Sequence, residues 1–302
     1  MRALTPWRRY ALRPLLVGAV VMLTRAPASA FVDDLGSRGL AMGGAGRADS
    51  RGDEAPLLNP SGMSLARLYT LQGHYQFTNP GGGQVVHASV VDSTSSFNLS
   101  GALYYTYRTA SATSFARSTG HEAGAALSAP FGERVMLGVT GKYLRVTGGA
   151  PEPDGASAHS GLTLDAGLTI RAGSVLTLGV VGYNLHDLST SLAPLSMGYG
   201  VAINVIPDLV IAADLYHDFG TWDATRGVRT SVAGGVDYTW AQRTAFRAGG
   251  GRDGGRDHAY LSAGFSAISD IGAVDLSLRQ DVTGTDKHTT LIASLRLFVP
   301  QP

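Results

Sequence analysis

The sequence predicts an all-β fold, a transmembrane antiparallel β-barrel of about 14 strands with an N-terminal plug (hatch) segment. Between Leu68 and Phe298 it repeats one pattern, in which about ten to twelve residues alternate between apolar and polar and then turn residues follow. After the first thirty residues no apolar stretch approaches the roughly 18 residues of a membrane helix. A membrane protein of this composition must therefore be a closed barrel, since lipid offers the backbone no hydrogen-bond partner.

The first thirty residues have the parts of a secretory signal peptide. Arginines at 2, 8, 9 and 13 precede an apolar run over 15–23, and small residues follow up to Ala30. The run is too short to span a bilayer, and Trp7 and Tyr10 fit a twin-arginine motif poorly. We therefore expect Sec export, cleavage after Ala30 and a final location in the cell outer membrane. The expected division is signal peptide 1–30, hatch 31–67 and barrel 68–302.

Composition excludes several classes of function. The chain has no cysteine, so it contains no disulfide and no cysteine-ligated metal. It has 24 basic and 23 acidic residues, and five of the basic ones lie in the signal peptide, so the mature chain would carry a net charge of −4. No basic patch for nucleic acid remains. Glycine, at 40 of 302 residues, is well above the roughly 7% of average proteins and marks close approaches, bends or turns in strands.

The alternation and the turn residues place the strands along the chain. We expect them at 68–77, 84–92, 96–108, 120–129, 134–146, 161–172, 174–184, 194–206, 208–217, 229–240, 243–250, 257–267, 271–281 and 287–298. Connections at 130–133, 172–173, 206–208, 241–242 and 269–270 are tight, and longer polar ones at 109–119, 147–160, 185–193, 220–227 and 251–256 fall between them. An exported barrel requires this order of short and long loops, whereas a β-sandwich does not.

The polar face of these strands is predicted to line the lumen. Within 162–171, for example, Leu162, Leu164 and Leu168 share one face, and Asp165 and Arg171 share the other. The titratable residues expected to face inward are His74, His87, Arg108, Lys142, Asp165, Arg171, Asp214, Asp237, Asp275, Arg279 and Arg296. Aromatic residues near strand ends are expected to form interfacial girdles; they are Tyr75, Phe77, Tyr104, Tyr105, Tyr107, Tyr183, Tyr216, Tyr238 and Trp240.

The segment before the first strand does not alternate and is too polar and glycine-rich to face lipid. Here the chain resembles the FadL and TodX family of outer-membrane transporters for hydrophobic compounds, whose glycine-rich N-terminus ends in an Asn-Pro-Ala-Gly element. The matching residues, which the resemblance assigns to a hatch inside a fourteen-stranded barrel, are Gly36, Arg38, Met42, Gly43, Gly44, Ala45, Asn59, Pro60 and Gly62. Ser61 stands where the family has Ala, and the strong match covers only about thirty residues.

The resemblance implies passive transport of small hydrophobic or amphipathic, fatty-acid-like molecules, with Asn59 and Pro60 as hinge candidates. Two departures leave an alternative open: the loops are short and polar, as 151–155 shows, and the lumen is polar rather than greasy. A plugged structural or scaffold barrel, similar to the PorV type that receives exported proteins, is that alternative. The partners expected are outer-membrane lipid, the barrel assembly machinery and a hydrophobic ligand, and nucleic acid is excluded.

Motifs for nucleotide binding, calcium binding and ester hydrolysis are matched only in part. Gly249, Gly251 and Gly254 fit Gly-x-Gly-x-x-Gly, but no βαβ unit surrounds them. A polar turn at 253–258 resembles a calcium loop less than it resembles an ordinary solvated turn. His74, His87 and Ser89 suggest an esterase arrangement, for which the pattern supplies no orienting carboxylate. The sequence therefore predicts no enzyme, no cofactor and no metal site.

Overall fold

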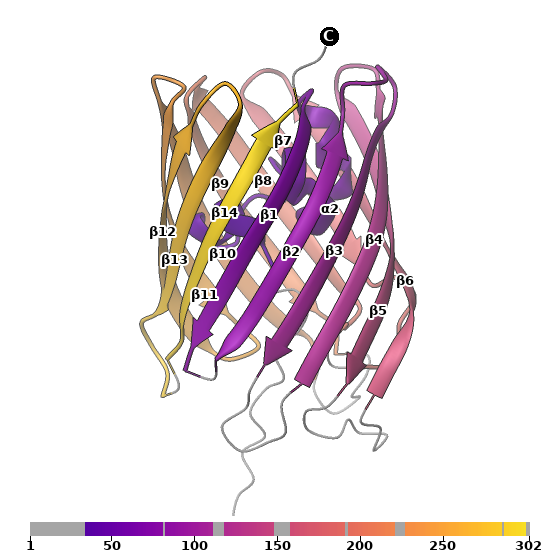
Figure 1. The fold of residues 1–302 in the computed structure, drawn as a ribbon, viewed down its shortest axis with the longest axis vertical. Coiled ribbons are helices and arrows are strands. Elements are labelled where there is room, and N and C mark those ends of the chain that lie inside the picture. The colour runs from indigo at the N-terminus through magenta and orange to yellow at the C-terminus, as the bar shows by residue number, and fades with distance from the viewer. Residues whose placement is uncertain are drawn as a thin grey trace, which may run out of the picture.

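A computed structural model describes residues 34–80, 82–110, 118–147, 158–190, 193–220, 227–285 and 287–299. The expected signal peptide and most of the longest loops lie outside this range. Within it, fourteen antiparallel strands form a closed barrel, in which β1 pairs with both β2 and β14 (Figure 1). The fold class and the number of strands predicted from the alternation are confirmed.

The observed strands differ from the expected ones mainly at their ends. They are β1 (Tyr69–Asn79), β2 (Gly83–Asp92), β3 (Ser100–Ala110), β4 (Ser118–Phe131), β5 (Val135–Thr147), β6 (Ala158–Ala172), β7 (Leu176–Tyr183), β8 (Ser196–Ile206), β9 (Leu209–Asp218), β10 (Arg229–Trp240), β11 (Thr244–Asp253), β12 (His258–Ile268), β13 (Gly272–Asp281) and β14 (Thr289–Phe298). The third strand starts at Ser100 rather than 96, because the Asp92 side chain accepts hydrogen bonds from the backbone of Thr94 and Ser95 and closes a turn there.

The two faces of the wall have opposite chemistry. Large apolar side chains on alternate positions of the strands are exposed on the outside, among them Leu127, Val139, Leu162, Leu276 and Leu295. Polar and charged side chains at the intervening positions are buried inside. An apolar surface that surrounds the whole barrel is stable only against lipid or another apolar phase.

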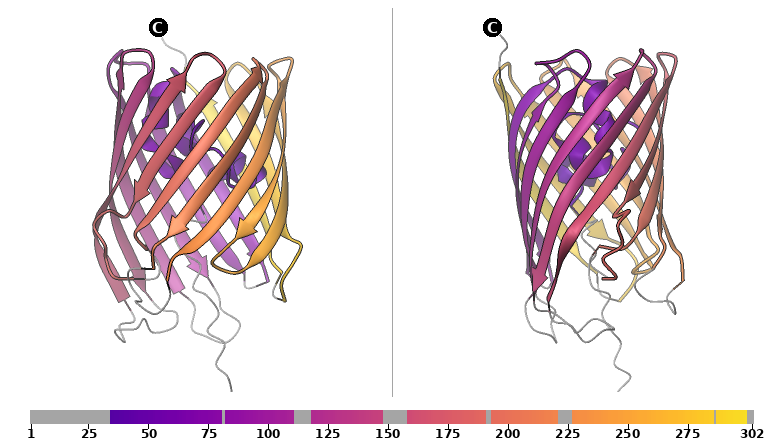
Figure 2. Two further views of the ribbon diagram at one scale, coloured as in Figure 1. Left: turned by 180° about the vertical axis from the view of Figure 1, so that it is seen from behind. Right: turned by 90° about the vertical axis from the view of Figure 1, so that its right-hand side faces the viewer.

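The segment before β1 lies inside the barrel, in the half nearer to the C-terminus (Figures 1 and 2). It contains four short helical turns: α1 (Gly36–Ala41), the 3-10 helix η2 (Gly52–Glu54), α2 (Ala55–Leu58) and the 3-10 helix η3 (Pro60–Leu65). In the part of the chain that the structure describes, no helix is long and apolar enough to cross a membrane. We call residues 34–68 the hatch.

Short helices suit this segment because its glycines and Asn59-Pro60 interrupt any longer one. Gly43 and Gly44 have positive φ values of 71° and 87°, which end α1. Met42, Ala45 and Ala48 then pack against Ala202 and Ala212 of β8 and β9. This apolar contact seats one side of the hatch on the wall.

Candidate functional site

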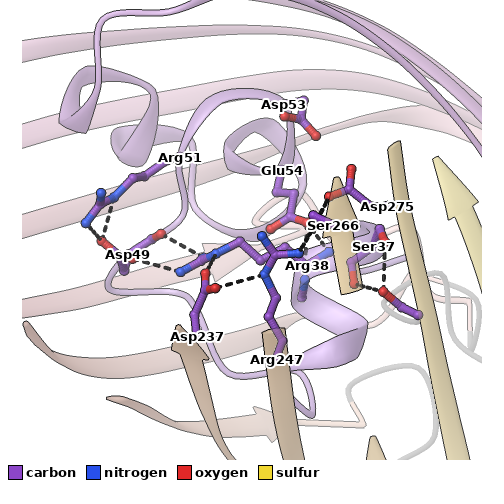
Figure 3. A network of polar contacts seen from close by, with 12 residues as sticks. Ser37, Arg38, Asp49, Arg51, Asp53, Glu54, Asp237, Arg247, Ser266 and Asp275 are labelled. Atoms are coloured by element: carbon purple, nitrogen blue, oxygen red, sulfur yellow. Dashed lines mark hydrogen bonds and ion pairs between the residues drawn. The ribbon is translucent and has the colours of Figure 1, made fainter. Parts of the chain in front are cut away.

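The first group of contacts between hatch and wall is centred on Arg38 of α1 (Figure 3). Its guanidinium donates to Asp237 of β10 at 2.7 Å and to Asp49 of the hatch at 2.9 Å. Arg247 of β11 donates to the other oxygen of Asp237 at 3.1 Å. One wall carboxylate therefore holds two arginines, one from the hatch and one from the barrel.

Glu54 of η2 lies beside this group and accepts hydrogen bonds from the backbone amides of Arg38, at 2.6 Å, and Gly39, at 3.2 Å. Burial and the neighbouring Asp53, opposed by Arg38, together raise the pKa of Glu54 to about 7. Burial also raises the pKa of Asp53, against the attraction of Arg296. Two adjacent carboxyl groups of the hatch thus share an environment that disfavours a second negative charge.

Arg47 makes the second connection. Its guanidinium lies 3.1 Å from Asp214 of β9, donates to the Tyr183 hydroxyl at 2.9 Å, and lies over the ring of Tyr216, 5.2 Å from the centroid. Asp214 also accepts from the backbone amides of Gly46 and Arg47, at 3.0 and 2.9 Å. All four bonds are buried, so their strength is little reduced by water.

Asn59 makes the third connection. Its amide donates to the Arg47 carbonyl at 2.8 Å and to the Thr169 hydroxyl of β6 at 3.2 Å, while its side-chain oxygen accepts from Ser61 and caps η3. The residue that departs from the family pattern, Ser61, also bonds to Thr169, at 2.7 Å. The Asn-Pro-Ser-Gly element is therefore fixed to the wall in this structure.

Inward-facing glycines of the wall allow the hatch backbone to come this close. An added Cβ at Gly200 would lie 2.7 Å from the Ala48 nitrogen, and one at Gly138 would overlap the backbone of Pro60 and Ser61. Further wall glycines that face hatch atoms in the same way are Gly167, Gly179, Gly235, Gly249 and Gly264. This groove contains seven of the 40 glycines.

Between hatch and wall lies a small cavity of about 30 Å³. At about 10–15 Å³ for one water molecule, this volume holds two or three waters and no hydrocarbon ligand. Its lining mixes leucines with charged and polar residues: Asp34, Leu35, Arg47, Leu57, Leu58, Tyr104, Arg108, Glu122, Lys142, Leu144, Asp165, Tyr183 and Asn184. Lys142 and Asp165 neutralise each other across β5 and β6 at 2.8 Å.

The wall beside this cavity is incompletely paired. Strand β6 pairs with β7 only from Ala166 to Ala172, so its first eight residues have no β7 partner. The segment after Tyr183 covers that edge with a few bonds, in which Leu185 N donates to the Leu164 carbonyl and Asn184 N to the Asp165 side chain, both at 2.8 Å. Asp165 and Asn184 also line the cavity, so the cavity lies directly behind this edge.

A buried histidine pair lies on β1 and β2, where His74 of β1 and His87 of β2 face each other across the ladder with ring centroids 4.7 Å apart. Asp34 of the hatch reaches them, with Oδ1 3.0 Å from His74 Nε2 and Oδ2 3.7 Å from His87 Nδ1. Burial would raise the pKa of Asp34, but the histidines and Arg108 lower it well below its ordinary value. The orienting carboxylate that the strand pattern lacked is therefore present, contributed by the hatch.

This group does not form the esterase arrangement considered from the sequence. The buried Ser89 hydroxyl makes no hydrogen bond with any described residue, so neither histidine is bonded to it. A nucleophilic serine needs a base within hydrogen-bond reach. The turn at 253–258 is likewise no cation site here, because Asp253 pairs with Arg256 at 2.9 Å and Asp257 with Arg252.

The structure places the predicted site residues as follows. The hatch residues Gly36, Arg38, Met42, Gly43, Gly44, Asn59, Pro60, Ser61 and Gly62 lie inside the barrel, and His74, His87, Arg108, Lys142, Asp165, Arg171, Asp214, Asp237, Asp275, Arg279 and Arg296 project inward from the wall. Arg38 and Asp237 meet at one connection, and the histidines meet Asp34. Arg296 binds Asp275 at 2.8 Å and lies 3.9 Å from Asp53 of the hatch, whereas Arg171 donates to the Leu65 carbonyl at 2.5 Å.

The expectation of interfacial girdles is wrong for three of the aromatic residues. Tyr104 and Tyr183 are buried, and Tyr216 is half-buried, with hydroxyls bonded to Glu122, to Leu58 and Arg47, and to Ser196. They face the lumen and hold the hatch and the charged groups beside it. Tyr75, Tyr105, Tyr238 and Trp240 are exposed on the outside, as expected.

No family profile and no curated protein matches the chain. Solved structures do. The chain is similar to the CymD monoaromatic hydrocarbon channel (TM-score 0.69, 14% identity, covering 87% of this chain and 97% of that one) and to the Pseudomonas putida toluene transporter TodX (0.66, 12%, 87% and 97%). It is also similar to a Pseudomonas aeruginosa FadL homologue (0.61, 11%, 86% and 97%). The FadL and TodX resemblance seen in the N-terminal segment is thus confirmed for the fold of nearly the whole chain.

Proposed function

We propose that the protein is an outer-membrane channel for passive passage of small hydrophobic or amphipathic molecules. One observation carries the proposal: the chain shares its fold, over 87% of its length, with a monoaromatic hydrocarbon channel and a toluene transporter. The apolar outer face and the predicted signal peptide support the location, where the partners would be membrane lipid and the barrel assembly machinery. No enzymatic activity is proposed.

The passage proposed here runs through the lumen to the cavity and leaves through the wall at the β6–β7 edge. The free energy of a hydrophobic molecule falls when it moves from a partly polar lumen into lipid, by about 25 cal/mol for each Å² of apolar surface removed from water. The edge is held by a few bonds from residues 184–186 in place of a full ladder. The cavity has to widen, and displacement of this segment or a movement of the hatch at Asn59 and Pro60 would widen it.

The absence of cysteine allows a direct test of this route. Cysteines at Leu164 and Leu185, whose backbones are hydrogen-bonded, would form a disulfide that locks the edge. A matched control places cysteines at Val139 and Ala166, which face each other in the complete β5–β6 ladder. Oxidation of the first pair should reduce uptake of toluene, or of a medium-chain fatty acid, to the level of a strain without the protein, and reduction should restore it. Equal uptake by both oxidised proteins would refute the route.

The alternative, a plugged structural or scaffold barrel, is favoured by a specific observation. The hatch is fixed by a partly buried ion pair at Arg38 and a buried one at Arg47, and the cavity beside it is far smaller than a ligand. Deletion of residues 36–62 separates the two functions. A channel should lose uptake or take up ligand without control, whereas a scaffold should show the same uptake with and without the deletion.

A further inference from the structure

Asp34, His74 and His87 form a compact set of potential metal ligands at the start of the hatch. Each of the three side chains is about 99% buried. Their nearest oxygen and nitrogen atoms lie 3.0 Å apart for Asp34 and His74, 3.7 Å apart for Asp34 and His87, and within 4.8 Å throughout the group. Ligands about 2.1 Å from a tetrahedral zinc ion lie about 3.4 Å from one another, so the observed separations bracket that value.

The same atoms lack ordinary partners. Asp34 Oδ1, both ring nitrogens of His74 and Nε2 of His87 make no hydrogen bond with any residue that the structure describes. Although Asp34 Oδ1 and His74 Nε2 are only 3.0 Å apart, their angle falls outside hydrogen-bonding geometry. A buried polar atom without a partner costs about 1–3 kcal/mol, so several of them in one place indicate that something else satisfies them.

The charge around the group accommodates a cation. Arg108 lies 3.6 Å from Asp34, but it is shared with Glu122 at 3.3 Å, so two carboxylates surround one guanidinium. His87 Nδ1 lies 2.7 Å from the Thr106 hydroxyl, which is also 3.4 Å from Asp34 Oδ2. A hydroxyl in this position can bond to the carboxylate when the imidazole nitrogen is given to a metal, as outer ligands commonly do.

We propose that Asp34, His74 and His87 bind a first-row transition metal ion of the zinc class. Two imidazoles and one carboxylate suit Zn²⁺, Ni²⁺ or Cu²⁺, whereas Ca²⁺ and Mg²⁺ prefer oxygen ligands alone. Asp34 lines the cavity, which offers a water molecule the fourth position. Because one ligand comes from the hatch and two come from β1 and β2, the metal fixes the start of the hatch to the wall. The sequence pattern, which predicted no metal site, had no means of bringing Asp34 to the histidines.

The test uses the folded barrel in detergent, purified without a polyhistidine tag and freed of metal with a chelator. Titration with Zn²⁺ should show saturable binding of one ion per chain, and Co²⁺ should give the visible absorption of a four-coordinate site. The variants His74→Gln and His87→Gln should each lose more affinity than the about 10–100-fold that outer-shell partners contribute. The matched control is His217→Gln, a half-buried histidine of β9 that bonds to Thr230 away from the group.

Wild-type protein that binds no ion at one per chain would overturn the proposal, whatever the variants do. Binding that the two histidine substitutions leave unchanged would also overturn it, because the metal would then sit elsewhere. Circular dichroism and the heat-dependent electrophoretic shift of folded barrels establish that each variant is folded, and Asp34→Asn offers a variant that leaves the wall intact. This test measures metal binding and not uptake, so its outcome is independent of whether the proposed channel function holds.

Discussion

The ion pair between Arg47 and Asp214 should contribute more to the seating of the hatch than any exposed pair of the barrel. Their side chains are 5% and 1% exposed. Asp214→Ala would leave the buried guanidinium without its counter-charge and the backbone amides of Gly46 and Arg47 without an acceptor. Removal of one partner of a buried pair costs about 3–5 kcal/mol. At about 1.4 kcal/mol for each factor of ten, the population of unseated hatch should rise at least about 100-fold.

Limited proteolysis with trypsin measures this population. Its hatch sites at Arg38 and Arg47 become cleavable when the hatch leaves the wall, whereas Arg51 and Arg67 are already exposed and are not counted. Under rapid reclosing the cleavage rate follows the open population. The control is Asp270→Ala, which removes the partner of Arg243 in a pair that is 57% and 87% exposed and is worth no more than about 1 kcal/mol. If cleavage of the hatch rises by less than about fivefold in Asp214→Ala, or equally in both variants, the buried pair does not seat the hatch.

Three further predictions follow from the contacts of the hatch. Gly138→Ala should release the hatch, because the new methyl group overlaps the backbone of Pro60 and Ser61, whereas Gly141→Ala on the outer face of the same strand meets nothing within 4 Å and should be neutral; equal tryptic cleavage of residues 36–62 in both would contradict the glycine groove. Because the pKa of Glu54 is raised from 4.5 to about 7, the folded hatch holds the proton more tightly than the unfolded chain, so its contribution to stability is complete below pH 4.5 and lost as the pH rises through 7. Hydrogen exchange of α1, corrected for its intrinsic pH dependence, should therefore increase between pH 5 and 7.5, and Glu54→Gln, next to Asp53 and the guanidiniums of Arg38, Arg247 and Arg296, should abolish that increase; a variant with the wild-type profile would assign the effect to another group. Asn59→Ala should lower the free energy of unfolding of the hatch by about 1–3 kcal/mol, since it removes the cap of η3, the donor to the Arg47 carbonyl and one of the two bonds of the Thr169 hydroxyl; denaturant unfolding monitored by hatch proteolysis would disprove this if the midpoint did not move.

The wall was predictable because most strand residues follow one local rule, although apolar residues such as Met136, Leu144 and Ile292 are also buried on the inner face. Leu164 and Asp165 are neighbours in sequence and meet opposite environments, so two-residue alternation carries the fold without knowledge of any distant contact. Strand ends were less predictable, because turns depend on single side-chain bonds such as those of Asp92. The aromatic residues show the same rule misapplied: Tyr104 has the parity of Arg108 and Tyr216 that of Asp214, so alternation assigns both to the lumen, whereas position near a strand end suggested the girdle.

The hatch contacts were not predictable in this way, because they join residues far apart in the chain through a segment without periodicity. Asp34 meets His74, but nothing in the residues around Asp34 distinguishes it from Asp33 or Asp49 as the partner of a wall histidine. The one accessible signal was the parity of the glycines. Gly138, with the parity of Lys142, and Gly167, with that of Asp165, lie on the lumen side, where a glycine gives a strand no packing advantage.

Glycines on the lumen face have a purpose only if another backbone lies against the wall. Polar side chains alone can line a water-filled pore. Replacing some of the inward-facing side chains with glycine would not stabilise such a pore. Gly200 and Gly138 instead remove the atoms that would keep Ala48 and Ser61 away from the wall, which places the Asp214 and Thr169 side chains within bonding distance of the hatch. Glycine parity, read together with inward carboxylates and hydroxyls, therefore indicates a barrel that holds its own N-terminal segment, and it does so from the wall sequence alone.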